Sequence, residues 1–178
     1  MTNYDFSQSH FELFGLPPAF QLDPERLEHS YREIQLRVHP DKFAHLGEQE
    51  RRLSMQWATH ANEAYQTLKK PLSRARYLLH LHGVDTQEDT NTAMPPEFLM
   101  RQMEWREAIG EARESQDAAG LEHLHHRLTV EMREQQARLG HLLDAEKNYP
   151  EAAALVRELR FMEKLAEEVD RALEILEE

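Results

Sequence analysis

The apolar residues along this chain recur mainly at the three- and four-residue spacing that is typical of one buried helix face. Residues 23–39 show this spacing, residues 48–68 repeat it, and three longer stretches follow after residue 94. Strict two-residue alternation and the Asn-Gly or Asp-Gly turns of β-hairpins are both missing. The pattern therefore predicts an all-α protein.

The first long helix has clear start and stop signals. Asp23 is a good N-cap residue and Pro24 suits the first helical position, whereas Pro40 disfavours helical geometry at His39. A short helical turn over residues 10–14 precedes it, and we expect a loop after Pro40 and then helices over 48–68 and 72–82. The residues expected to face inward are Leu27, Tyr31, Ile34, Val38, Leu53, Trp57, Ala61, Ala64, Leu68, Ala75, Leu78 and Leu79.

Residues 83–94 are polar and have no apolar period, which predicts a linker. Three longer helices follow, with short connections near residues 115–120 and 144–150, and short connections favour antiparallel neighbours. We therefore predict one domain over residues 1–82, the linker over 83–94 and an antiparallel three-helix bundle over 95–178. Two apolar stripes of the bundle are Leu121, Leu124, Leu128, Met132, Gln135, Leu139 and Leu142, and Leu155, Leu159, Met162, Ala166, Val169, Leu173 and Leu176.

The charge is distributed unevenly between the two predicted domains. The whole chain has a net charge of −12, yet the first 75 residues hold 9 Lys/Arg against 10 Asp/Glu. The remaining 103 residues hold 12 Lys/Arg against 23 Asp/Glu, so the two parts are expected to meet different partners. An acidic surface of this kind argues against nucleic acid and anionic membranes as the main partners.

Cysteine is absent, and this excludes disulfides, zinc sites with Cys ligands and thiol catalysis by this chain. The absence also fits a reducing cytoplasm. No run of about 18 apolar residues could span a membrane. We expect no signal peptide, because no basic segment followed by an apolar one stands near the N-terminus.

The segment His39-Pro40-Asp41 follows directly on an amphipathic helix and precedes Lys42-Phe43. The proline ends the helix and stiffens the chain, so that Asp41 offers a fixed carboxylate that can pair with an arginine of a partner. His39 stands at a helix C-terminus, where partial positive charge is favoured. Without its context such a tripeptide is only a helix stop.

The helix over residues 96–114 carries two apolar stripes, of which a three-helix bundle can bury one broad face. The stripe that includes a tryptophan is the better core, and it consists of Phe98, Trp105, Ile109 and Ala112. The opposite stripe should form an exposed apolar patch with an acidic rim, and such patches are usually interaction sites. We call it the α-patch; it comprises Leu99, Met100 and Met103 with the rim Glu104, Glu107 and Glu111.

On the last helix, Phe161 lies off the buried stripe and is expected to extend the α-patch. An alternative is that this second stripe packs on the N-terminal domain or on a second copy of the chain.

Several segments resemble HscB-type proteins, the J-domain co-chaperones of iron–sulfur cluster assembly, over nearly the whole chain. They are Phe11–Pro17, His39–Phe43, Arg74–Leu79, Leu81–Gly83, Phe98–Met100 and Leu159–Leu165. The resemblance implies an N-terminal J-domain joined to a C-terminal three-helix bundle. It also implies a cytoplasmic co-chaperone that stimulates the ATPase of an Hsp70 of the HscA type and delivers to it a scaffold protein of the IscU type. Such a protein is not an enzyme and needs no cofactor.

The resemblance assigns two sets of site residues. The Hsp70-binding residues are Arg32, Leu36, Arg37, His39, Pro40, Asp41 and Lys42. Arg32 and Leu36 point away from the buried stripe of their helix, although Glu28 and Glu33 make that face mixed in charge. The scaffold-binding residues are Leu99, Met100, Met103, Glu104, Glu107, Glu111 and Phe161.

Two alternatives remain open at this point. One is a J-domain co-chaperone with a different client. The other is a His-ligated metalloenzyme or metal carrier built on His80 and His82 or on His123, His125 and His126, although scattered surface histidines are the more ordinary interpretation. No catalytic motif, phosphate-binding loop or dinucleotide fingerprint is present, so we expect no catalytic residue and no metal site.

Overall fold

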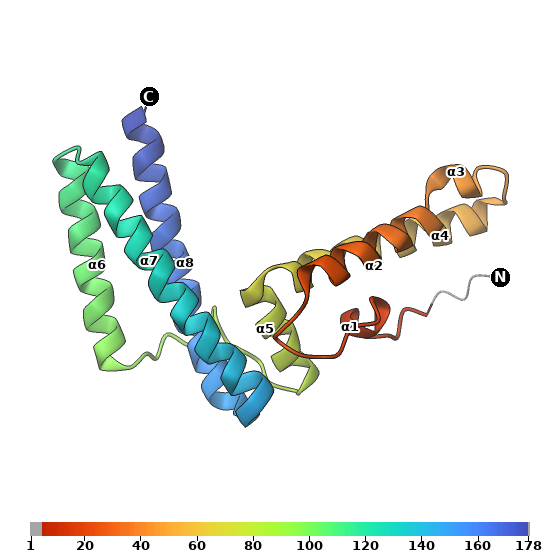
Figure 1. Cartoon of the computed structure of the whole chain (residues 1–178), viewed down its shortest axis with the longest axis horizontal. Coiled ribbons are helices and arrows are strands. Elements are labelled where there is room, and N and C mark those ends of the chain that lie inside the picture. The colour runs from red at the N-terminus through yellow and green to blue at the C-terminus, as the bar shows by residue number, and fades with distance from the viewer. Residues whose placement is uncertain (1–4, 178) are drawn as a thin grey trace. The chain divides into compact units, whose positions relative to one another are not determined.

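The computed structural model describes residues 5–177, and over this range it contains helices and no strand (Figure 1). The prediction of an all-α protein is confirmed. The chain forms two compact units that divide between Leu78 and Leu79, within helix α5. Among the described residues, no helix is both long enough and apolar enough to cross a membrane.

The first unit contains α1 (His10–Leu13), α2 (Pro24–Arg37), α3 (Pro40–Phe43), α4 (Glu48–Lys69) and the start of α5 (Pro71–Leu81). The helices α2 and α4 lie side by side and are joined by the short segment that includes α3 (Figure 1). The Tyr31 and Tyr65 rings stack between them at 4.2 Å, and the Tyr31 hydroxyl donates to Asn62 Oδ1 at 3.0 Å. The buried apolar residues of this pair are Leu27, Ile34, Val38, Trp57, Ala61, Ala64 and Leu68, as predicted. Tyr31 and Leu53, which were also expected to face inward, are only partly buried.

The start and stop signals of α2 act as the sequence predicts. Asp23 caps the helix by accepting hydrogen bonds from the Glu25 and Arg26 amides, at 3.0 and 3.4 Å. The helix ends at Arg37, and the Val38 amide makes the last bond, to the Ile34 carbonyl. The expectation of a loop after Pro40 was wrong, because Pro40 occupies the first position of the short helix α3. A proline is compatible with that position since its missing N–H would have no partner there.

An aromatic cluster holds α1 against α4 and α5. The His10 ring stacks on Tyr77 at 4.2 Å and meets His60 edge to face at 5.8 Å, and Phe6 packs edge to face on Trp57. Burial and the nearby His60 lower the pKa of the His10 imidazole, against the opposing effect of Glu63. This cluster therefore favours a neutral His10.

The second unit contains α6 (Pro96–Glu114), α7 (Ala118–Gly140), the π-helical segment η1 (His141–Glu146) and α8 (Tyr149–Glu177). Successive helices reverse direction, so that α6 and α8 run parallel to each other and antiparallel to α7, and each of the three helices contacts the other two (Figure 1). The predicted antiparallel three-helix bundle is confirmed. The expected connection over residues 144–150 is shorter than predicted, because η1 continues to Glu146 and Lys147 turns the chain at a φ of 55°.

The polar segment between α5 and α6 is not helical, as its composition predicts. One end of it is fixed to the bundle, where Arg157 Nη1 of α8 donates to the Thr86 carbonyl at 3.0 Å. The Thr86 side chain is buried and its hydroxyl donates to Glu88 Oε2 at 2.7 Å. The start of this segment is therefore part of the second unit.

Candidate functional site

The His39-Pro40-Asp41 segment stands at the turn between α2 and α4, and buried contacts fix its base. The Ser54 hydroxyl of α4 is buried and donates to the Val38 carbonyl at 2.9 Å. His39 has extended geometry, with φ −58° and ψ 133°, and this redirects the chain before Pro40 begins α3. The end of α2 and the start of α3 are separated by only two residues, Val38 and His39, and thus hold the backbone of the segment in one conformation.

The two polar side chains of this segment are directed to solvent. His39 Nδ1 accepts a hydrogen bond from the Asp41 amide at 3.3 Å, so it caps α3. Asp41 Oδ2 lies 3.6 Å from the same nitrogen, but an unprotonated Nδ1 has no proton to donate. The Asp41 side chain is 91% exposed and its carboxylate is therefore available to an external cation.

The other residues that the sequence assigns to Hsp70 binding lie on α2, apart from Lys42, which lies in α3. The Leu36 side chain is 64% exposed, and Arg37 and Lys42 are also exposed. Arg32 is exposed but its guanidinium lies 2.6 Å from Glu28 Oε1, one helical turn earlier. The positive charge of Arg32 is thus partly balanced in the free protein, which agrees with the mixed charge seen in the sequence.

The α-patch is exposed on α6, as predicted, and its three apolar members are Leu99, Met100 and Met103. The three rim residues Glu104, Glu107 and Glu111 are exposed as well. On the opposite side of the helix Ile109 and Ala112 are buried, whereas Phe98 and Trp105 are only partly buried. Trp105 therefore lies on the buried side of α6, as expected, but it is only partly buried rather than a core residue.

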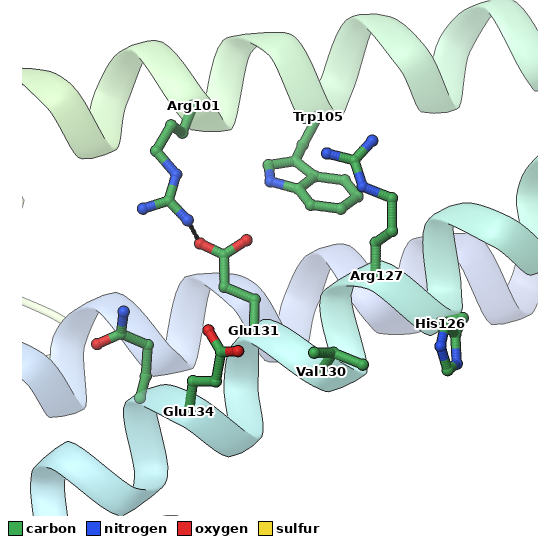
Figure 2. A pocket seen from close by; sticks show the side chains of 8 residues that line it. Arg101, Trp105, His126, Arg127, Val130, Glu131 and Glu134 are labelled. Atoms are coloured by element: carbon green, nitrogen blue, oxygen red, sulfur yellow. Dashed lines mark ion pairs between the residues drawn. The ribbon is translucent and has the colours of Figure 1, made fainter.

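Two polar contacts between α6 and α7 lie at and beside the partly buried Trp105. The Arg127 guanidinium of α7 lies over the Trp105 ring, 4.8 Å from its centroid, and Arg101 of α6 forms an ion pair with Glu131 of α7 (Figure 2). These residues line a groove of about 560 Å³ between the two helices. Polar contacts thus hold the first half of α6, and buried apolar contacts hold the second half.

The sequence contains a signal for these contacts that the spacing of apolar residues does not reveal. Arg101 and Trp105 are four residues apart on α6, and their respective partners Glu131 and Arg127 are four residues apart on α7. Residues four apart lie on one helix face. Two such pairs, taken in opposite directions along antiparallel helices, meet in register.

Phe161 of α8 is partly buried, and Lys164 Nζ lies 5.7 Å from the centre of its ring. The register between α6 and α8 is marked by an ion pair, in which Arg106 Nη1 lies 3.6 Å from Glu168 Oε1. Because α6 and α8 run parallel, two turns towards their N-termini lead from this pair to Leu99 and Phe161. The register therefore places Phe161 at the level of the α-patch.

The structure shows the surroundings of the histidines that the sequence raised as metal ligands. Among residues 5–177, no group of three or more His, Cys, Asp or Glu side chains is placed to hold a metal ion. His82 stacks on Tyr149 at 4.2 Å, and His125 Nε2 lies 3.1 Å from Asp170 Oδ1. These two histidines have structural contacts within the second unit.

Two helices that flank an exposed His-Pro-Asp turn, followed by a three-helix bundle, define a J-domain protein with a helical C-terminal domain. Residues 94–170 match the family model described as the HscB C-terminal oligomerisation domain. Two curated relatives, each named co-chaperone protein HscB homolog, are from Azoarcus sp. and Aromatoleum aromaticum. They are 55% and 52% identical, each over 97% of this chain and 98% of its own length.

Solved structures agree with the sequence relatives. The chaperone HscB from Vibrio cholerae is 40% identical with a TM-score of 0.83, over 95% of this chain and 99% of that one. The human co-chaperone protein HscB is 28% identical with a TM-score of 0.88, over 94% of this chain and 83% of that one. The chain therefore belongs to the HscB family of co-chaperones.

Proposed function

We propose that this protein stimulates the ATPase of an Hsp70 chaperone of the HscA type and delivers to it an iron–sulfur scaffold protein of the IscU type. In this proposal the protein acts in the cytoplasm, is not itself an enzyme, and binds neither nucleic acid nor membrane. Residues 1–82 serve the Hsp70, and residues 95–178, joined to them by 83–94, serve the scaffold protein. The relatives named HscB support this role.

The observation that carries the Hsp70 half is the exposed carboxylate of Asp41 on a fixed turn. A carboxylate on a fixed backbone can accept a bidentate pair of hydrogen bonds from an arginine with a smaller loss of conformational freedom than one on a mobile loop. The exposed Leu36, Arg32, Arg37 and Lys42 lie on α2 or directly after the turn and would extend the contact. Because Arg32 is already paired with Glu28, we expect a modest dependence of this contact on salt.

The test of this half is the single-turnover ATPase rate of an HscA-type Hsp70 with and without the protein. Asp41→Ala should abolish the stimulation. Its melting temperature should stay close to that of the wild type, because exposed substitutions change stability by no more than about 0.5 kcal/mol. Glu50→Ala is a matched control, since it removes one exposed carboxylate from the same unit. An undiminished rate with Asp41→Ala would contradict the assignment.

The scaffold half is supported by the α-patch, which combines an exposed apolar centre with carboxylates around it. Apolar anchors at the centre of an interface dominate its binding energy, and rim charges favour a partner of opposite charge. The register of α6 and α8, which puts Phe161 at the level of the α-patch, supports the inclusion of Phe161 in this surface. We therefore propose that the scaffold protein presents an apolar surface with basic residues around it.

Calorimetric titration with an IscU-type scaffold protein tests this half. Replacement of Leu99, Met100 and Met103 together by Ala should lower the affinity at least tenfold, about 1.4 kcal/mol. Phe161→Ala should also weaken binding. Ile175→Ala is the control, because Ile175 is an equally exposed apolar residue of the bundle outside the α-patch. If the triple variant binds as well as the wild type, the α-patch does not bind the scaffold protein.

A further inference from the structure

The methionines of this chain differ sharply in their exposure. Met100 and Met103, both in the α-patch, are 63% and 71% exposed. Met55 on α4 is 67% exposed, whereas Met162 in the core of the bundle is only 4% exposed. Because the chain has no cysteine, thioethers are its only sulfur groups. Two of the most accessible ones thus lie together at the centre of the proposed scaffold-binding surface.

We propose that Met100 and Met103 form a reversible oxidation site, at which conversion to methionine sulfoxide by a peroxide switches off binding of the scaffold protein. This inference rests on the function proposed above. It adds to that function a modification site and a condition under which the co-chaperone releases its client.

The chemistry is a two-electron oxygen transfer. A lone pair on the thioether sulfur attacks one oxygen of hydrogen peroxide, the O–O bond breaks, and the other oxygen leaves as water after proton transfer. The sulfur is oxidised and the peroxide is reduced, so that one thioether and one H₂O₂ give one sulfoxide and one H₂O. Methionine sulfoxide reductases reverse the change with two thiols, which become a disulfide while the sulfoxide oxygen leaves as water.

The sulfoxide group is poorly suited to the interface that the α-patch would form. It replaces an apolar, flexible thioether by a strong dipole whose oxygen can only accept hydrogen bonds. The neighbouring side chains of the α-patch are Leu99, which is apolar, and glutamates, whose carboxylates also only accept. A buried acceptor without a donor is unfavourable, so the oxidised surface should bind an apolar partner weakly.

The free protein should tolerate the same change. Met100 and Met103 are exposed, so water can solvate their sulfoxides without loss of core packing. Met162, where a sulfoxide would disrupt the core, is shielded by its burial. Oxidation is therefore expected to alter binding while the bundle stays folded.

The experiment treats the purified full-length protein with hydrogen peroxide, removes the oxidant, and measures two quantities. Peptide mass spectrometry gives the sulfoxide fraction at each methionine, and calorimetric titration with an IscU-type scaffold protein gives the dissociation constant. Each variant is compared with itself before and after peroxide. The variants are the wild type, Met100→Leu with Met103→Leu, and Met55→Leu.

We expect sulfoxide at Met100, Met103 and Met55 well before Met162, with an unchanged melting temperature. The dissociation constant of the wild type and of Met55→Leu should rise at least tenfold after peroxide. That of the double Leu variant should change less than twofold, whatever its starting value. Treatment of the oxidised wild type with methionine sulfoxide reductases should restore its original dissociation constant.

The outcomes separate this inference from the proposed function. If the untreated wild type does not bind the scaffold protein, the proposed function fails and the binding switch fails with it. If the untreated protein binds but its sulfoxide form at Met100 and Met103 binds equally well, only the oxidation switch is wrong. A loss of binding that also occurs in the double Leu variant would likewise overturn it, because another residue would then be responsible.

Discussion

Ile109 and Met103 lie on opposite sides of α6, and truncation to alanine should affect them very differently. Ile109 is 2% exposed, and Ile109→Ala removes three carbon atoms from this buried side chain. At about 0.8 kcal/mol for each buried CH₂ the transfer contribution alone is about 2.4 kcal/mol. The cavity that remains adds to this cost, which places the total within the range of about 2–5 kcal/mol.

Met103→Ala is the matched comparison on the same helix. Met103 is exposed, so its truncation removes little buried surface, and alanine has a slightly higher helix propensity than methionine. The free energy of unfolding should therefore change by less than about 0.5 kcal/mol. For a domain of this size each kcal/mol shifts the melting temperature by about 4–8 °C, so Ile109→Ala should melt about 10 °C or more below the reference.

Urea unfolding followed by tryptophan fluorescence can measure this difference in the second unit alone. Trp105 lies in α6 and Trp57 lies in the first unit, so a Trp57→Phe background leaves Trp105 as the only reporter. Both alanine variants are made in that background and compared with it. If Met103→Ala destabilises the bundle as much as Ile109→Ala, the α-patch is buried and the assignment of the two stripes is wrong.

Three further predictions concern the first unit. Leu36→Ala should weaken Hsp70 stimulation but hardly change the melting temperature, because Leu36 is exposed. The control Ile34→Ala should lower the free energy of unfolding by about 2–5 kcal/mol, because Ile34 is buried. Equal destabilisation of the two variants in thermal melts would mean that Leu36 is a core residue. In urea unfolding, Asp23→Ala should lower the free energy of unfolding by about 1 kcal/mol, because the side chain that caps α2 is lost. Asp23→Asn should lower it by less, because asparagine can still cap the helix. Because the pKa of His10 is lowered in the folded protein, the unfolded chain takes up this proton at a higher pH than the folded chain does. The free energy of unfolding should therefore fall as the pH drops below about 6.5. His10→Phe should make stability depend less on pH in thermal melts from pH 8 to pH 5.

The parts of the fold that the sequence could predict are those in which local chemistry decides. Asp23, Pro24 and Pro40 set the ends of α2 through capping and steric effects that need no tertiary contact. The failure at α3 has the same kind of cause, because the proline that ends one helix also begins the next. A π-helical turn such as η1 has no local signal of this strength, and the connection after α7 was therefore predicted too long.

The exposure of the candidate site residues was predictable from the sequence, but their contacts were not. The exposure of the α-patch follows from the period of α6, yet the ion pair of Arg32 with Glu28 and the cap that His39 provides for Asp41 depend on rotamers. The period also could not show that Trp105 is only partly buried. The Arg127 guanidinium that lies over the Trp105 ring comes from a different helix, so the period of α6 gives no sign of this contact.

The surface beneath α6 adds a second determinant of its rotation. Both stripes of the helix are apolar, although only the α-patch carries a rim of glutamates. Beneath the first half of α6, however, the bundle presents the carboxylates of Glu131 and the half-buried Glu158. Burial raises the pKa of the Glu158 carboxyl, and the nearby Arg138, Arg101 and Arg157 offset only part of this effect. A helix rotated to bury Met100 and Met103 would place thioethers on these carboxylates and separate Arg101 from Glu131, leaving charges uncompensated. The Arg101–Glu131 ion pair and the Glu158 carboxylate therefore disfavour the alternative rotation. The α-patch stays exposed, where its apolar surface is available to a partner.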